Sequence, residues 1–138
     1  MKKFSVITFL IALIVSICGF TSCVSQYDYD YDNGSAFVFG DGVKVDGKDL
    51  NGWTPSDPNG KMKYNKDAKA FVSSVEIKTT SAFKFIVNGS YWSEEKVKDS
   101  PLVKGVDDGY GGKNLNVTED GTYTITVDIN NEKITIVK

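Results

Sequence analysis

The stretch that decides the fold is residues 81–92, which read Ser-Ala-Phe-Lys-Phe-Ile-Val-Asn-Gly-Ser-Tyr-Trp. Apolar residues stand at every second position from 83 to 87, and a period of two is typical of a strand with one buried face. Asn-Gly follows at residues 88–89, and this dipeptide favours a tight turn because both residues tolerate positive φ. The sequence therefore predicts a hairpin whose returning strand begins with the aromatic pair at residues 91–92.

The register of this hairpin decides which aromatic ring lies beside Lys84 on the outer face. A two-residue turn pairs Phe85 with Trp92, which places Tyr91 outside and Trp92 inside. A three-residue loop with a bulge moves Trp92 to the Lys84 side. Local turn chemistry favours the first alternative, and both remain open at the level of the sequence.

Runs of alternating or apolar residues between turn signals predict the other strands. They are expected at residues 36–39, 61–64, 70–77, 113–117, 122–128 and 133–137. Together with the hairpin they make about seven antiparallel strands, and no helical period of useful length occurs, which indicates an all-β sandwich. We expect a turn at residues 79–81 and a long polar connection at residues 43–60, which contains Trp53.

The N-terminus has the layout of a lipoprotein signal peptide. Two lysines precede an apolar stretch, residues 4–20, that is too short for a permanent membrane anchor. The stretch leads into Phe-Thr-Ser-Cys, which resembles a bacterial lipoprotein cleavage box, so Cys23 is the expected site of lipidation. The alternative is an ordinary secretory signal with an unmodified Cys23.

This signal defines the expected domain organisation. We expect residues 1–22 to be removed, residues 23–35 to form an acidic Tyr/Asp linker, and residues 36–138 to form the sandwich. The only other cysteine, Cys18, lies in the signal, so the mature chain has no disulfide framework. The lipid, palmitate included, is expected to anchor the protein in the outer membrane, with surface exposure favoured over the periplasmic face.

Charge and composition argue against nucleic acid as a partner. The chain has sixteen Lys, no Arg and no His, against eighteen acidic residues. Loss of residues 1–22 would remove two of the lysines and no acidic residue, which leaves a net charge of −4. Neither a basic stripe nor a planar Arg guanidinium is present to bind phosphates.

Catalysis and cofactor binding find little support in the sequence. No His is available as a general base, and no nucleophile motif occurs. Glu94-Glu95 and Asp107-Asp108 are the carboxylate pairs that could serve a glycosidase, but adjacent side chains in a strand or turn point apart. The acidic residues Asp41, Asp46, Asp49 and Asp57 lack the spacing of a calcium loop. The sequence therefore predicts a non-enzyme that needs no metal or cofactor.

Several of these features occur in the order found in a known family. They are Phe83-Lys84-Phe85, Asn88-Gly89, Trp92 and the ending Gly-Thr-Tyr-Thr-Ile-Thr-Val-Asp at residues 121–128. The chain resembles the immunoglobulin-like domains of starch-binding outer-membrane lipoproteins in Bacteroidetes starch-utilisation systems. It is also similar to the glycogen-binding module of the AMP-activated kinase β-subunit. The resemblance covers residues 37–138.

The resemblance implies an immunoglobulin-like sandwich that binds glycans, with an α-glucan such as starch as the expected ligand. By position, the platform rings are Trp53 and Trp92, while Lys84 and Asn114 bind sugar hydroxyls. Tyr91 replaces Trp92 if the turn has two residues. Such residues suit a sugar, because its C–H face stacks on an aromatic ring and its hydroxyls need donors and acceptors.

The resemblance also implies a glycan-uptake transporter complex as a partner. The rival interpretation is a structural or protein-interaction lipoprotein with the same sandwich and no sugar site. A structure can distinguish the glycan-binding interpretation from this rival. Glycan binding requires platform rings that are exposed and close together.

Overall fold

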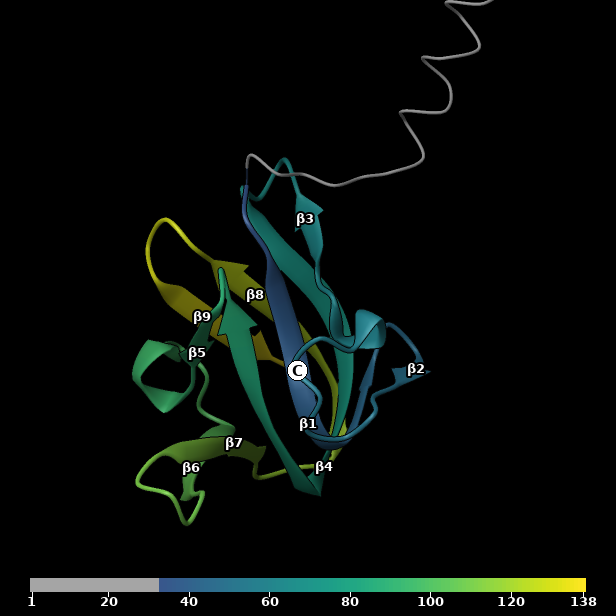
Figure 1. Ribbon diagram of the computed structural model, residues 1–138, viewed down its shortest axis with the longest axis vertical. Coiled ribbons are helices and arrows are strands. Elements are labelled where there is room, and N and C mark those ends of the chain that lie inside the picture. Colours follow the sequence, from purple (N-terminus) through teal and green to yellow (C-terminus); the bar gives the residue numbers. More distant parts are fainter. Residues whose placement is uncertain (1–32) are drawn as a thin grey trace, which may run out of the picture. The chain divides into compact units, whose positions relative to one another are not determined.

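The computed structural model describes residues 33–138 of the 138-residue chain. The predicted signal peptide, Cys23 and nearly all of the predicted linker lie outside the described residues. The described residues form nine strands and two short 3-10 helices (Figure 1). The strands are β1 (Ala36–Val45), β2 (Lys48–Asp49), β3 (Lys63–Asn65), β4 (Ala70–Val87), β5 (Ser90–Trp92), β6 (Val103–Asp107), β7 (Lys113–Val117), β8 (Gly121–Asp128) and β9 (Lys133–Val137); the helices are η1 (Pro58–Gly60) and η2 (Glu94–Lys96). No helix within residues 33–138 is long and apolar enough to cross a membrane.

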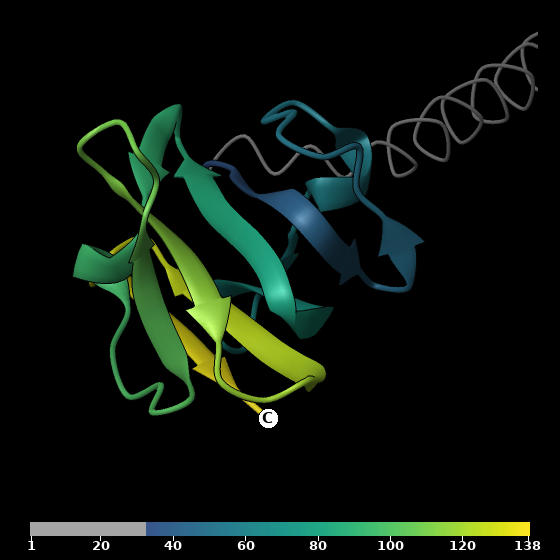
Figure 2. The same ribbon diagram turned by 90° about the horizontal axis from the view of Figure 1, so that it is seen from below.

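Strand β4 belongs to both layers of the fold. Its first half, up to Ile77, pairs with β8, which in turn pairs with β9. Its second half, from Ala82, pairs with β5 and β7 on one edge, and β1 pairs with the opposite edge along parts of both halves. All of these pairings are antiparallel. In Figure 1, β5, β6 and β7 (green) lie on one side of β4, with β2 and β3 on the opposite side, and Figure 2 shows the same strands from below. The predicted all-β sandwich is confirmed.

The turn expected at residues 79–81 is wrong, because the chain continues there as one bent strand. The pairing between β1 and β4 shifts register between Asp41 and Val43, opposite this bend. The Ser81 hydroxyl donates to the carbonyl of Gly42 at 2.6 Å and accepts from the backbone N–H of Lys78 at 3.0 Å. Strands that bend in this way pass from one sheet of a sandwich to the other.

Inward-facing residues of both layers form one hydrophobic core. The predicted inner faces are confirmed for β4, β7, β8 and β9, whose buried members include Phe71, Val75, Ile77, Phe83, Phe85, Val87, Leu115, Val117, Tyr123, Ile125, Val127, Ile134 and Ile136. The rings of Phe83 and Phe85 meet edge to face at a centroid distance of 5.9 Å. The Tyr123 hydroxyl donates to the carbonyl of Glu119 at 2.6 Å, an arrangement that resembles the tyrosine corner of immunoglobulin-like sandwiches.

Two segments outside the expected strands contain strands. The polar connection predicted at residues 43–60 begins with the last part of β1 and then forms β2, and Val43 and Val45 are buried in the core. Residues 103–107, which are not among the expected strands, form β6 and pair with β7. Backbone pairing at these edges does not need apolar side chains, so hydrophobic alternation alone missed them.

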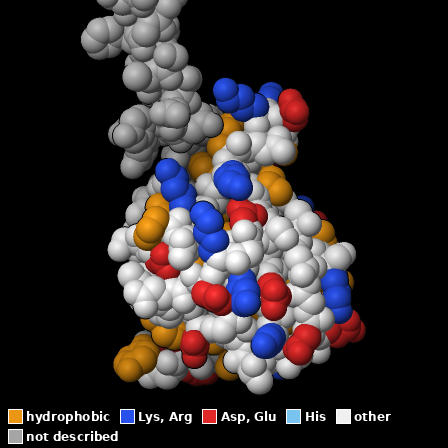
Figure 3. Space-filling view, turned by 90° about the vertical axis from the view of Figure 1, so that its right-hand side faces the viewer, with side chains coloured by type: hydrophobic (Ala, Val, Ile, Leu, Met, Phe, Trp, Pro, Cys, Tyr) orange, Lys and Arg blue, Asp and Glu red, His pale blue; other side chains and the backbone are white. Residues whose placement is uncertain are grey.

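The surface on the side of β2 and β3 carries both signs of charge. Figure 3 shows Lys side chains interspersed with Asp and Glu on the face toward the right of Figure 1. Ion pairs on this side join Lys44 to Asp49 at 3.7 Å and Lys63 to Asp46 at 3.6 Å. Neither sign of charge dominates this face.

Candidate functional site

The β4–β5 hairpin has a two-residue turn. Asn88 and Gly89 have φ values of 49° and 80°, and Val87 pairs directly with Ser90. Two consecutive positive φ values are the signature of the tight turn that Asn-Gly favours. The turn therefore has the shorter of the two lengths considered.

This register places Trp92 inside and Tyr91 outside. Trp92 pairs with Phe85 and is only 8% exposed, whereas Tyr91 pairs with Ile86 and is 65% exposed. The position that the resemblance implied for Trp92, beside Lys84 on the outer face, is thus contradicted, because successive residues of a strand point to opposite faces. Trp92 instead belongs to the core cluster, with the Lys96 ammonium 5.2 Å from its ring centroid.

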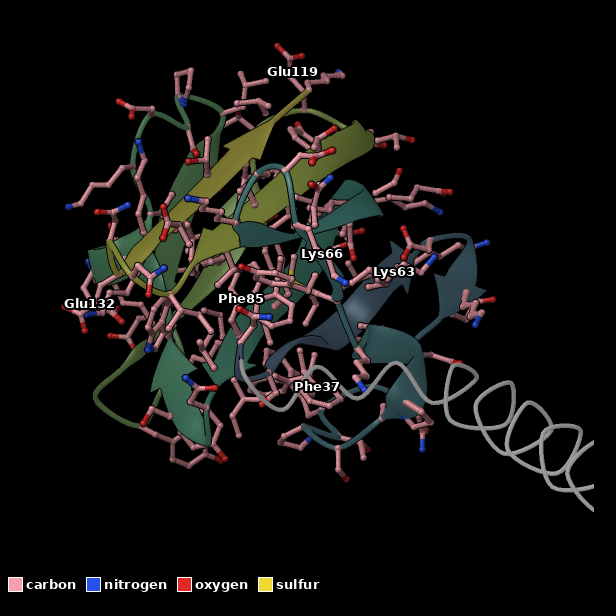
Figure 4. All side chains as sticks on the ribbon, turned by 90° about the horizontal axis from the view of Figure 1, so that it is seen from above. Phe37, Lys63, Lys66, Phe85, Glu119 and Glu132 are labelled. Atoms are coloured by element: carbon pink, nitrogen blue, oxygen red, sulfur yellow. The ribbon has the colours of Figure 1, made fainter. Side chains whose placement is uncertain are left out.

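A row of outward side chains crosses the sheet next to this hairpin. Phe39 of β1 pairs with Lys84 of β4, and the pairing of Phe83 with Leu115 sets Lys84 beside Asn114 on β7. Figure 4 shows the two faces of this sheet, with Phe85 between the layers and Phe37 on the outer side. The outer face therefore carries Phe39, Lys84 and Asn114 side by side.

The loop before η1 brings Trp53 over this row. The backbone N–H of Gly40 donates to the carbonyl of Gly52 at 3.1 Å, which ties the loop to β1 beside Phe39. The buried Asp57 carboxylate accepts from the backbone N–H of Asn51 at 2.6 Å and of Asn59 at 2.9 Å, and so holds both ends of the loop. Trp53 is consequently fixed above β1 while 46% of it stays exposed.

Phe39 lies between two exposed rings. Its centroid is 5.8 Å from that of Trp53, with an interplanar angle of 82°, and 5.8 Å from that of Tyr91, at 52°. Phe39 itself is buried. The two exposed rings are therefore no further apart than twice that distance, and both are held by aromatic packing on a rigid strand.

Lys84 forms a well-shielded ion pair with Asp108. Its ammonium donates to Oδ2 of Asp108 at 2.5 Å, and the two side chains are 19% and 11% exposed. The hydrogen bond from Lys84, followed by those from the backbone N–H groups of Tyr110 and Gly112, lowers the pKa of Asp108 from 3.8 to about 2. Asp108 is therefore ionised at neutral pH, and its carboxylate holds the Lys84 ammonium through one of the three N–H donors.

These side chains line one open pocket of about 420 Å³. Its lining residues are Phe39, Trp53, Lys84, Tyr91, Asp108, Tyr110 and Asn114. Four of the five predicted ligand-binding residues, Trp53, Lys84, Tyr91 and Asn114, are thus brought together. Trp92 is not among them.

Sequence reasoning missed Phe39, Asp108 and Tyr110 as pocket residues. Phe39 had a signal, because Phe37 and Phe39 alternate with the inward Val38 and so mark an aromatic outer face. Asp108 and Tyr110 lie between β6 and β7 in a Gly-rich segment with no hydrophobic period. Their place in the pocket depends on the fold of the loop, which the sequence pattern does not reveal.

Both carboxylates of the Glu94-Glu95 pair are engaged by other groups of the chain. Glu94 pairs with Lys113 at 2.6 Å, and Glu95 accepts from the backbone N–H of Ser93 at 3.0 Å. Within residues 33–138, no group of three or more potential ligands could hold a metal ion.

An antiparallel sandwich with an open, aromatic-lined pocket on its outer face has the architecture of a carbohydrate-binding module. The model of the family described as "SusF/SusE starch specific CBMs" matches residues 23–135, and the chain belongs to this family of carbohydrate-binding modules. The resemblance to starch-binding lipoprotein domains is thereby confirmed. No curated protein and no solved structure gives a significant match to the chain.

Proposed function

We propose that the domain binds α-glucans, such as starch or maltooligosaccharides, in the pocket that contains Trp53, Lys84, Tyr91 and Asn114. One observation carries the proposal. Residues from four separate segments, which the resemblance and the hairpin register implied as sugar-binding, line a single pocket, in a family described as starch-specific.

Each side chain of the pocket suits one part of a glucose unit. The exposed rings of Trp53 and Tyr91 offer faces for the apolar C–H surface of a pyranose. Lys84 gives one N–H to Asp108 and keeps donors for sugar hydroxyls. Among the described residues, the Asn114 side-chain amide makes no hydrogen bond, so it can both donate to a ligand and accept from it. The inclined rings favour a curved chain over a flat one.

The charge state of Asp108 favours binding without catalysis. Asp108 is the carboxylate in this pocket, and a glycosidase needs a general acid whose pKa is raised. The pKa of Asp108 is instead lowered to about 2, because Lys84 hydrogen-bonds its charged form. An acid held in this state is a poor proton donor at neutral pH.

The proposal extends to the place of the protein in the cell. The signal layout supports cleavage before Cys23 and lipidation of that residue. The resemblance to starch-utilisation lipoproteins is the ground for an outer-membrane location with the domain at the surface, next to a glycan-uptake transporter. The family match also begins at Cys23. Labelling of cells with radioactive palmitate tests the anchor: label should enter the wild-type protein and be lost in Cys23→Ala. Protease treatment of whole cells should then degrade the domain if it faces outward.

Calorimetric titration tests the binding proposal. Protein expressed from the full-length sequence and purified in detergent is titrated with maltoheptaose and, as a β-linked control, with cellohexaose. We expect binding to maltoheptaose only, with a loss of affinity in Lys84→Ala and none in the matched control Lys48→Ala on the exposed strand β2. Equal heats for the two sugars would reject selectivity for α-glucans. No heat with either sugar would reject glycan binding and favour a protein-interaction role.

A further inference from the structure

We propose that Tyr110 is an additional stacking ring of this site, held in place by Asp108, and that it makes the site favour longer α-glucan chains. The inference rests on the proposed function and concerns residues 107–112, the end of β6 and the loop that joins it to β7. We call this segment the Tyr110 loop.

Tyr110 is placed where a ligand can reach it. It is 96% exposed, more than any other large hydrophobic side chain of the described residues, and it lines the same pocket as Trp53 and Tyr91. A phenol ring at a loop tip gains nothing from the core of its own domain. In a sugar pocket the same ring is available to stack on a pyranose.

The Tyr110 loop has a defined shape despite its glycines. Oδ1 of Asp108 accepts from the backbone N–H of Tyr110 at 2.8 Å and of Gly112 at 3.0 Å. The backbone N–H of Asp108 donates to the carbonyl of Gly112 at 3.1 Å, and Oδ1 of Asp107 accepts from Gly109 at 2.7 Å. The ring is therefore presented before any ligand arrives, which lowers the entropic cost of binding.

The ion pair fastens this loop to the sheet. One carboxylate oxygen of Asp108 holds the loop backbone, while the other accepts from Lys84 on β4. A Cβ at Gly112 would lie 2.7 Å from Oδ2 of Asp108 and 3.5 Å from the Lys84 ammonium, so a side chain there would displace the carboxylate. Asp108 thus acts as a positioning residue, because it sets the direction of both Lys84 and Tyr110.

The strand order places Tyr110 and Trp53 at opposite ends of the pocket. The order is β1-β4-β7, with Trp53 packed on Phe39 of β1 and the Tyr110 loop leading into β7. Adjacent strands are about 4.8 Å apart, so β1 and β7 are separated by about 10 Å. A glucan that touches both rings crosses β4 at Lys84, and a disaccharide is too short to span that distance while it stacks on both rings.

The test compares a short and a long ligand on the same protein. Protein from the full-length sequence, purified in detergent, is titrated with maltose and maltoheptaose by calorimetry. We expect Tyr110→Ala to weaken maltoheptaose binding about tenfold and to change maltose binding less than about twofold, while Tyr110→Phe keeps the ring and the wild-type affinities. Asp108→Asn should weaken maltoheptaose binding less in the Tyr110→Ala background than in the wild type, because part of its effect acts through Tyr110.

The outcomes separate this inference from the proposed function. Wild-type affinity of Tyr110→Ala for maltoheptaose, or an equal loss for both sugars, overturns the role of Tyr110 and leaves glucan binding intact. Equal effects of Asp108→Asn in both backgrounds overturn the positioning role. Wild-type protein that binds neither sugar refutes the proposed function and this inference with it.

Discussion

Tyr91 and Trp92 are consecutive residues of β5 that lie on opposite faces of one sheet, and they are 65% and 8% exposed. The two-residue turn at Asn88 produces this arrangement, because it pairs Trp92 with the core residue Phe85. The outer ring is available to a ligand and the inner ring is needed by the core. Substitutions at these neighbouring positions should therefore have different effects.

Trp92→Ala should destabilise the fold, and Tyr91→Ala should not. Removal of a buried Trp side chain leaves a cavity and costs about 3–5 kcal/mol in the free energy of unfolding. Loss of the exposed Tyr91 ring should cost under about 1 kcal/mol but lower the affinity for maltoheptaose about tenfold. Urea unfolding followed by circular dichroism, with calorimetry for the sugar, measures both quantities. The reverse pattern would show that the longer turn is present in solution.

Trp53→Ala should weaken glucan binding by about 2 kcal/mol, or roughly thirtyfold, with a small effect on stability. The ring packs on Phe39 with one edge and exposes the rest, so its removal takes away ligand contact more than core contact. Trp53→Tyr, which keeps an aromatic face, should retain part of the affinity. An alanine variant with unchanged affinity would place the ligand elsewhere.

The Lys84–Asp108 pair predicts a defined pH dependence of stability. The folded-state pKa of Asp108 is lowered to about 2, chiefly by the hydrogen bond from Lys84. A lowered pKa means that the pair contributes stability above the unfolded-state pKa of about 3.9, and that this contribution is lost as the pH falls toward about 2. The difference in unfolding free energy between wild type and Asp108→Asn should be constant above about pH 5 and shrink below about pH 4. A difference that stays the same down to pH 2 would contradict the ionic role.

The buried hydroxyl of Ser73 leads us to expect that its removal stabilises the core. Its hydroxyl is buried on β4 and has no hydrogen-bond partner among the described residues. A buried hydroxyl without a partner is costly, so Ser73→Ala should leave the unfolding free energy unchanged or raise it by about 1 kcal/mol. Ser81→Ala is the matched control: its buried hydroxyl makes two hydrogen bonds, and its loss should cost about 1–2 kcal/mol. Similar losses for both variants would show that Ser73 is satisfied in solution.

Much of this fold can be predicted from the sequence where alternation is strong. The inner faces of β8 and β9 follow from Tyr123, Ile125, Ile134 and Ile136, because burial of one sheet face imposes a period of two. The bend of β4 at Thr79 could not be predicted this way. Polar, exposed residues look the same in a turn and in a strand that crosses between layers.

Most residues of the candidate site could be predicted from the sequence, but the way in which the fold places them could not. Residue chemistry and resemblance pointed to Trp53, Lys84, Tyr91 and Asn114, yet one residue of hairpin register separated Tyr91 from Trp92. Asp108 enters the pocket through a long-range ion pair with Lys84, and no local pattern encodes such a contact.

The most direct test of glucan binding in this pocket uses the two tryptophans of the chain. Trp53 lines the pocket, whereas Trp92 belongs to the core. Each indole N–H gives its own NMR signal, and Trp53→Phe assigns the pair. On titration of ¹⁵N-labelled protein with maltoheptaose, we predict that the Trp53 signal shifts in a saturable way while the Trp92 signal stays in place. A titration in which neither signal moves, or in which only the Trp92 signal moves, would contradict the claim that this pocket binds α-glucan.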